Sequence, residues 1–125
     1  MFKPKQFADF LLQSIPYKYY ANDFPPDSPD EAAWVRLTGG YAPSEWSPRK
    51  LPSVQIVVRG HQSKAVQTEE IADQIYKFLH QKREFHVASH LVRFCKADQS
   101  SPIYAGRDDN GRVIYSLNFT LVVME

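Results

Sequence analysis

The most regular hydrophobic pattern of the chain is an alternation over its last residues, from Val113 to Met124. A period of two is typical of a β-strand, because successive side chains point to opposite faces. One face of this strand carries only apolar residues, namely Val113, Tyr115, Leu117, Phe119, Leu121 and Val123. The other face is mixed in polarity. We therefore predict one long strand over 113–124. One of its faces packs in the core, and the other is exposed to solvent or contacts a partner.

A charged turn, Arg107-Asp108-Asp109-Asn110-Gly111-Arg112, opens this strand. Asn-Gly is a strong hairpin signal, because a two-residue type I′ turn needs positive φ at both positions. A two-residue Asn110-Gly111 loop sets Asp109 opposite Arg112, which is an attractive pair, whereas a four-residue loop sets Arg107 opposite Arg112. We therefore predict the two-residue loop.

Apolar periodicity predicts two helices and four further strands along the rest of the chain. The first helix covers 5–15 and stops at Pro16, and the second is capped by Ser63 or Thr68 and runs to about Lys82. Their buried stripes are Phe7, Phe10 and Leu11, and Ile71, Ala72, Ile75, Phe78 and Leu79. The strands cover residues 33–37, 52–60, 85–95 and 102–105.

Between Pro16 and Pro52 the chain is rich in proline and aromatic residues, which favours loops around the one strand at 33–37. A long irregular segment inside a compact domain is usually functional. Aromatic side chains in such loops are typical of protein interfaces. We therefore predict that Tyr41 and Trp46 bind a partner.

This order of elements predicts an α+β fold in a single domain, 1–125. The expected sheet is mostly antiparallel, with about four to five strands and two helices packed on one face, plus the long Pro- and aromatic-rich loop segment.

The composition narrows the class of protein. In 125 residues, 43% are hydrophobic and 23% charged, which indicates a folded domain rather than disorder. A net charge of +1 gives no electrostatic reason to expect sequence-specific nucleic-acid binding or an anionic membrane as partner. The apolar runs are too short for a transmembrane helix, and residues 1–15 do not read as a signal peptide. The single cysteine, Cys95, excludes an intrachain disulfide.

The sequence contains no set of residues whose spacing and chemistry fit a catalytic, cofactor or metal site. His86 and His90 lie too far apart to share an ion if both sit in the strand 85–95. Asp108, Asn110 and Gly111 fit part of a calcium loop, but Gly106 and Leu117 occupy ligand positions that need oxygen. We therefore predict a protein that is not an enzyme and uses no cofactor.

Several segments together resemble the minor capsid proteins that serve as tail terminators in long-tailed phages. They are Arg36 to Gly40, Pro52 to Gly60 with its Arg-Gly end, the helix from Ala65 to Leu79, and Pro102 to Phe119 with its Gly-Arg-Asp-Asp turn. The resemblance covers most of residues 6–125. It implies a virion protein, made in the host cytoplasm, that sits in the neck at the top of the tail.

The resemblance also implies partners. Such proteins form a ring, usually of six subunits, that caps the tail tube and meets the head-completion proteins, and DNA can pass through its lumen. Sheet edges or the mixed face of the last strand would pack against neighbouring subunits. The hairpin tip (Arg107, Asp108, Asp109 and Arg112) and the 39–51 loop with Tyr41 and Trp46 would reach axial partners.

Two other functions are compatible with the residues alone. One is a small, soluble, non-enzymatic domain that binds a protein or ligand through its aromatic loops. The other is a hydrolase, which the absence of a recognisable nucleophile motif disfavours.

Overall fold

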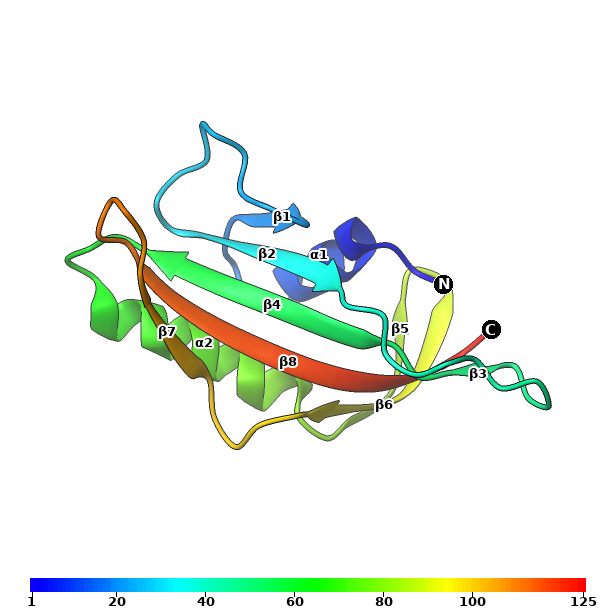
Figure 1. The fold of residues 1–125 in the computed structure, drawn as a ribbon. Coiled ribbons are helices and arrows are strands. Elements are labelled where there is room, and N and C mark those ends of the chain that lie inside the picture. The colour runs from blue at the N-terminus through cyan, green and yellow to red at the C-terminus, as the bar shows by residue number, and fades with distance from the viewer.

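Strand β8 (Val113–Met124) is the centre of the fold in the computed structural model, which describes residues 1–125 (Figure 1). The other strands are β1 (Tyr19–Ala21), β2 (Ala32–Leu37), β3 (Arg49–Lys50), β4 (Ser53–Gly60), β5 (Lys82–Val87), β6 (His90–Ala97) and β7 (Ile103–Arg107). The helices are α1 (Pro4–Leu12) and α2 (Ala65–Leu79). Neither α1, with nine residues, nor α2, with fifteen, could span a membrane.

The eight strands form one sheet in the order β1-β2-β4-β8-β6-β5, with β3 and β7 also paired to β8. On one side of β8, β4 pairs from Gly60↔Val113 to Ser53↔Thr120. On the other side, β7 pairs with its first residues and β6 with its last ones. All pairs are antiparallel except β1 with β2. The long strand therefore has partners on both sides along its length.

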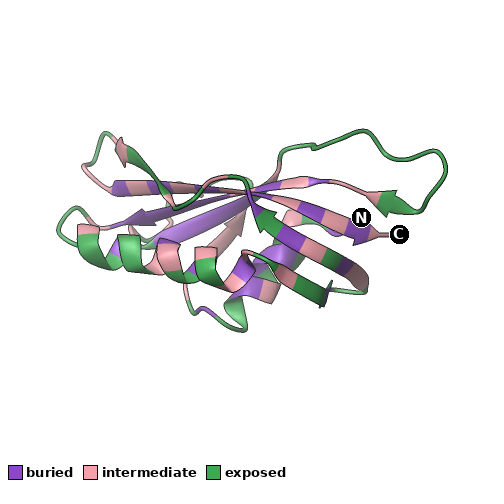
Figure 2. Cartoon of the chain, turned by 90° about the horizontal axis from the view of Figure 1, so that it is seen from below, coloured by how far each residue is buried: buried purple, intermediate pink, exposed green.

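Both helices cover the same face of the sheet, because side chains from α1 and α2 join one core cluster with the inward residues of β2, β4, β6 and β8. Phe7 and Leu11 of α1 and Ile75 of α2 are fully buried in it. The helices lie on one side of the sheet in Figure 2, and the opposite side has no helix. This arrangement confirms the predicted α+β class, with both helices on one face.

The predicted faces of the two longest central strands are confirmed. In β8 the six alternate apolar residues from Val113 to Val123 are buried and the residues between them are half-buried. In β4, Val54, Ile56 and Val58 are fully buried. The other face of β4 is more buried than the sequence suggests, since Val57 and Arg59 are also buried.

The predicted helix ends are wrong by about one turn. Helix α1 ends at Leu12, before Pro16, and α2 ends at Leu79 rather than at Lys82. Neither predicted residue caps α2, because Thr68 lies inside the helix and donates to Lys64 O. The predicted stripe residues Phe10, Ile71 and Phe78 are only half-buried at the edge of the core.

The predicted single strand over 85–95 is wrong, because the chain reverses at Ala88 and forms the β5–β6 hairpin. Ala88 has a φ of 53°, a left-handed conformation that the sequence does not signal with glycine or asparagine. His86 therefore pairs with Leu91 across the hairpin, and His90 pairs with Val87. The strand-spacing argument about the two histidines does not apply to this arrangement.

The strand count is higher than predicted, at eight rather than four to five. Besides the extra hairpin strand, β1 and β3 lie in the segment expected to be loop, and both are very short. Their pairing depends on contacts with β2 and β8, which local sequence patterns do not encode.

The predicted two-residue turn at Asn110-Gly111 is also wrong. Asp108 N–H donates to Arg112 O at 3.0 Å, and Gly111 N–H donates to Asp108 O at 2.9 Å, so three residues form the loop. Only Gly111, with a φ of 76°, adopts positive φ. This is the pattern of a type I turn followed by a left-handed residue. Asp108, rather than Asp109, consequently faces Arg112.

Candidate functional site

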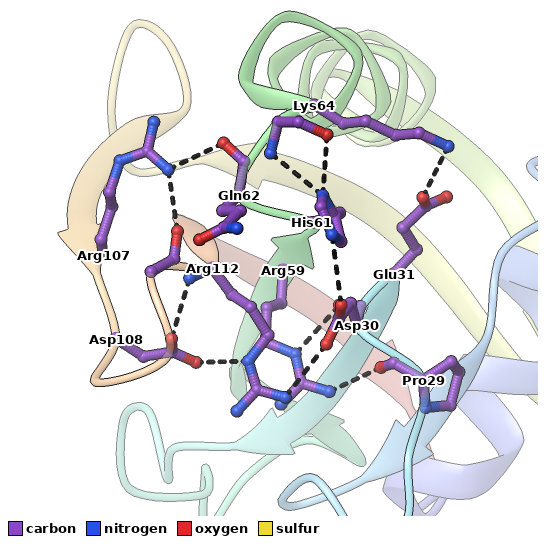
Figure 3. A network of polar contacts seen from close by, with 12 residues as sticks. Pro29, Asp30, Glu31, Arg59, His61, Gln62, Lys64, Arg107, Asp108 and Arg112 are labelled. Carbon is purple, nitrogen blue, oxygen red and sulfur yellow. Dashed lines mark hydrogen bonds and ion pairs between the residues drawn. The ribbon is translucent and has the colours of Figure 1, made fainter.

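A network of charged groups joins the β7–β8 hairpin to the loop before β2 (Figure 3). Its centre is Arg59, at the end of β4, which is only 4% exposed. Its guanidinium donates to Asp30 O at 3.0 Å, Pro29 O at 2.6 Å and Ser28 Oγ at 2.9 Å. It also lies 3.9 Å from the centroid of the Phe24 ring. A buried arginine with this many partners fixes the 22–31 loop.

Arg112 links the same loop to the hairpin. Its Nε donates to Asp108 Oδ2 at 2.8 Å, and its Nη1 lies 3.4 Å from Asp30 Oδ1. Burial and the neighbouring charge of Arg112 lower the pKa of Arg59, while Asp108 and Asp30 oppose that shift. The two carboxylates therefore compensate two guanidinium groups that lie close together.

Asp108 shapes the turn as well as pairing with Arg112. Its Oδ1 accepts from the N–H groups of Asn110 at 3.0 Å and Arg112 at 2.9 Å. Burial raises the pKa of Asp108, but the hydrogen bonds and charge of Arg112 and the Asn110 N–H outweigh it, so the pKa lies below its usual value. The ionised form is thus the one that the turn requires.

Arg107 also bonds inward, to Gln62 O at 3.0 Å and Gly111 O at 2.8 Å. The loop after β4 is tied further by Lys64, which pairs with Glu31 at 3.0 Å. Of the four charged tip residues predicted to bind a partner, Arg107, Asp108 and Arg112 are therefore engaged within the chain. Asp109 is exposed and makes no ion pair, which leaves it as the outward charge of the hairpin tip.

The other two predicted residues lie elsewhere. Tyr41 and Trp46 are 71% and 92% exposed on the loop 39–48, which we call the aromatic arm. The arm leads into β3, which pairs with Met124 and Val123 at the far end of β8 from the hairpin. Figure 1 shows the arm and the hairpin at opposite ends of the molecule. The structure therefore does not bring the six predicted residues together.

A groove on the helical face was not predicted from the sequence. It lies between α2 and β7, has a volume of about 600 Å³, and is lined by Val66, Glu69, Glu70, Asp73, Ser101, Pro102, Tyr104 and Tyr115. Tyr115 Oη donates to Glu69 Oε2 at 3.0 Å. We call it the acidic groove. The signal in the sequence was the run Thr68-Glu69-Glu70, which is equally typical of a helix N-terminus facing solvent.

The remaining candidates for chemistry are dispersed. No group of three or more His, Cys, Asp or Glu side chains could hold a metal ion. Cys95 is fully buried, and burial raises the pKa of its thiol. Ser63 Oγ lies 2.8 Å from His61 Nδ1, but His61 Nε2 lies 3.9 Å from Asp30 Oδ2. That distance is too long for the hydrogen bond by which a carboxylate orients a histidine base.

The polar clusters are thus organised to brace loops and to expose two separate surfaces. A search of curated proteins found no match. The model of one protein family, described as bacteriophage tail terminator protein, matches residues 12–124. That match spans the sheet, α2, the arm and the hairpin, and it agrees with the resemblance seen in the sequence. The chain therefore belongs to the bacteriophage tail terminator family and is a structural protein of the phage tail.

Proposed function

We propose that the protein forms a ring that caps the head-proximal end of the phage tail tube and joins the tail to the head-completion proteins. Membership of the family supports a role in the tail. On this proposal the protein acts by binding alone and is not an enzyme, and the assembled ring lies in the neck of the virion. The ring is expected to contain six subunits.

The observation that supports the ring is that the two ends of the subunit, along β8, carry different surfaces. The charged hairpin and the acidic groove lie at one end, and the aromatic arm lies at the other. A closed ring needs a heterologous interface, in which two different surfaces of the same chain meet. A subunit whose exposed apolar groups are divided between two ends meets that requirement.

The sheet face without helices offers a second surface for assembly. A row of uncharged polar residues crosses it, including Gln55 and Ser116, which are joined by a hydrogen bond of 3.1 Å. The strands β1 and β5 are the two ends of the strand order, and each pairs with a strand on one side only. These features support contacts with neighbouring subunits or with the tube.

The hairpin tip is the part of this subunit best suited to an axial partner. It is held rigidly by Asp108 and Arg112 and presents Asp109 and Asn110 to solvent. Changing Arg112 is a poor test of docking, because its side chain is 21% exposed and bridges two carboxylates. Asp109→Lys reverses the outward charge while leaving the bracing contacts in place.

The ring is tested by size-exclusion chromatography with light scattering and by negative-stain imaging, on the protein alone and mixed with tail-tube protein. We expect a closed ring at one end of each tube. A strict monomer in both samples at high concentration would overturn the proposal. Asp109→Lys should form rings but join heads poorly, whereas Asp9→Lys on α1 serves as a charge-matched control. Normal head joining by Asp109→Lys removes the hairpin from the docking surface.

A further inference from the structure

The exposed large apolar side chains of the protein fall into two main groups at opposite ends of the sheet. Tyr41 and Trp46 lie on the aromatic arm, and Val66 and Tyr104, which are 67% and 57% exposed, line the acidic groove. Leu12, 49% exposed at the end of α1, and Ile103, 45% exposed and paired with Ser116 on the opposite face of the sheet, stand apart. Exposed apolar groups gathered in this way mark interaction sites.

We infer that the aromatic arm of one subunit inserts Trp46 into the acidic groove of a second copy of this chain. The inference rests on the proposed ring and names the surfaces that close it. Neither surface is assigned by membership of the family.

The arm is shaped for insertion before it meets a partner. Its tip is turned by hydrogen bonds from Trp46 N–H to Ser44 Oγ at 3.2 Å and from Arg49 N–H to Ser47 Oγ at 3.1 Å. Its base is closed by Tyr41 N–H, which donates to Leu51 O at 3.0 Å. A segment that is already turned loses less conformational freedom on binding than an open loop does. Trp46 is nevertheless left 92% exposed.

The base of the arm is also packed too closely to swing freely. A Cβ at Gly40 would stand 2.2 Å from Leu51 O, so the chain entering the arm is in close contact with the chain that follows β3. Glu125 N–H donates to Pro48 O at 2.9 Å, which ties the arm to the end of the chain. The arm thus projects Trp46 from the sheet in a defined direction.

The groove offers what a tryptophan anchor needs. Tyr104 and Tyr115 form an aromatic wall, with ring centroids 5.6 Å apart in an edge arrangement, and Pro102 and Val66 add apolar surface. A volume of about 600 Å³ leaves room for an indole and its neighbours. Interface anchors of this kind are typically Trp or Tyr in a pocket rimmed by polar groups.

The charges of the two surfaces are complementary. Glu69, Glu70 and Asp73 line the groove, and no ion pair satisfies Glu69 or Glu70. Directly after the arm, β3 carries Arg49, which makes no ion pair, and Lys50, which pairs with Glu125 at 3.6 Å. Glu45 is the only acidic residue of the arm. Placing Trp46 in the groove therefore brings Arg49 towards carboxylates that make no ion pair. This attraction favours the arm of a second copy as the occupant of the groove over an acidic segment of another protein.

The arm cannot reach the groove of its own chain. Arg49 pairs with Met124, whereas Tyr115 in the groove lies nine positions earlier in the same strand. At about 3.3 Å per residue that separation is roughly 30 Å. An arm at one end and a receptor at the other end make a head-to-tail contact, which closes into a ring when the rotation per subunit allows it.

Disulfide trapping tests the contact directly, because the native Cys95 is fully buried and engineered cysteines are the accessible thiols. Ser47→Cys and Val66→Cys are made as separate proteins, so that both anchors, Trp46 and Tyr104, remain. Mixed and oxidised with tail-tube protein present, they should give a covalent dimer. The double variant should give a ladder that ends at the size of the ring. Ser47→Cys mixed with Leu12→Cys is the control, since Leu12 is exposed away from the groove.

A charge swap provides a second readout. Arg49→Glu and Glu70→Arg should each weaken self-association, and the two proteins mixed with each other should associate better than either alone. Trp46→Ala should weaken ring formation about 30-fold or more, as for a central interface anchor, while Asp9→Arg should leave it unchanged.

The outcomes separate this inference from the proposed function. Rings that form without a cross-link above the Leu12 control overturn the contact and leave the ring intact. Normal ring assembly by Trp46→Ala together with a loss of tube binding also overturns the contact. That result would show that the arm binds the tail tube and not a neighbouring subunit. An absence of both rings and cross-links in the presence of tail-tube protein overturns both.

Discussion

The Asp108 carboxylate holds Arg112 twice, by the backbone N–H at 2.9 Å and by the side-chain Nε at 2.8 Å. One residue thereby sets the shape of the hairpin and fixes the side chain that reaches Asp30 in the loop before β2. The turn and the bracing of the 22–31 loop therefore depend on the same carboxylate. A chemical change at Asp108 affects both.

Asp108→Asn should lower the free energy of unfolding by about 1–2 kcal/mol, because it weakens hydrogen bonds to a charged acceptor at a partly exposed site. Thermal or urea unfolding at neutral pH measures the loss. Asp109→Asn, at the neighbouring exposed position, should change the stability little. Equal losses for the two variants would contradict the role assigned to Asp108.

The same carboxylate should contribute to acid unfolding. Its folded-state pKa lies below the ordinary value, so its contribution to stability is complete above the unfolded pKa and is lost as the pH falls through the folded pKa. With an ordinary aspartate pKa of about 3.9, the loss begins below about pH 5. Melting temperature plotted from pH 6 to 2 should fall less steeply in Asp108→Asn than in the parent protein. Parallel curves would show that protonation of Asp108 is not linked to unfolding.

Arg59 should be irreplaceable by lysine. A lysine keeps the charge but cannot reproduce a planar fork that donates to Ser28, Pro29 and Asp30 and stacks on Phe24. We expect Arg59→Lys to cost about 1–3 kcal/mol of stability and to increase protease cleavage within 22–31.

Arg93→Lys is the matched control, because Arg93 is exposed and makes one ion pair, with Glu84 at 3.3 Å. Its stability and cleavage pattern should resemble those of the parent protein. An Arg59→Lys protein as stable as the Arg93→Lys protein would show that the buried network adds nothing to the fold.

The parts of the fold that the sequence predicts are those with strong, long periodicity. The alternation in β8 and β4 and the stripe of α2 are repeated often enough to specify both the element and its buried face. The α+β class and the helices on one face follow from them. The hairpin at Ala88 does not, because a left-handed alanine is held by the pairing of β5 with β6 rather than by local preference.

The candidate site divides in the same way. Exposure of Tyr41 and Trp46 follows from their place in a proline-rich loop, and the structure has them exposed. The inward use of Arg107 and Arg112 could not be predicted, since their partners Gln62 and Asp30 are distant in the sequence. Asp108 bonds within the turn, to Asn110 and Arg112, and was missed because the loop has three residues rather than two. The acidic groove needs α2 and β7 side by side, which only the completed sheet provides.

Cys95 should be unreactive in the folded protein. It is fully buried, and burial raises the pKa of the thiol, so neither access nor thiolate is available at neutral pH. Labelling with a maleimide should be complete in denaturant and negligible without it, as measured by intact mass. Rapid labelling of the native protein would show that β6 opens readily and would require Cys95→Ala in the trapping experiments.

Gly60 should tolerate no side chain, because the end of β4 lies against α2 there. A Cβ at Gly60 would stand 1.7 Å from Thr68 Oγ1 and 2.9 Å from its Cβ. Gly60→Ala should therefore destabilise the protein by about 1–3 kcal/mol through overpacking.

Thr68→Ala removes the nearest atom but also the bond from Oγ1 to Lys64 O, at 2.7 Å. The double variant should lose less stability than the sum of the two single losses, because the clash is partly relieved. Additive losses in denaturant unfolding would mean that the strand and the helix separate instead of pressing together, so that β4 and α2 are not rigidly joined at this point.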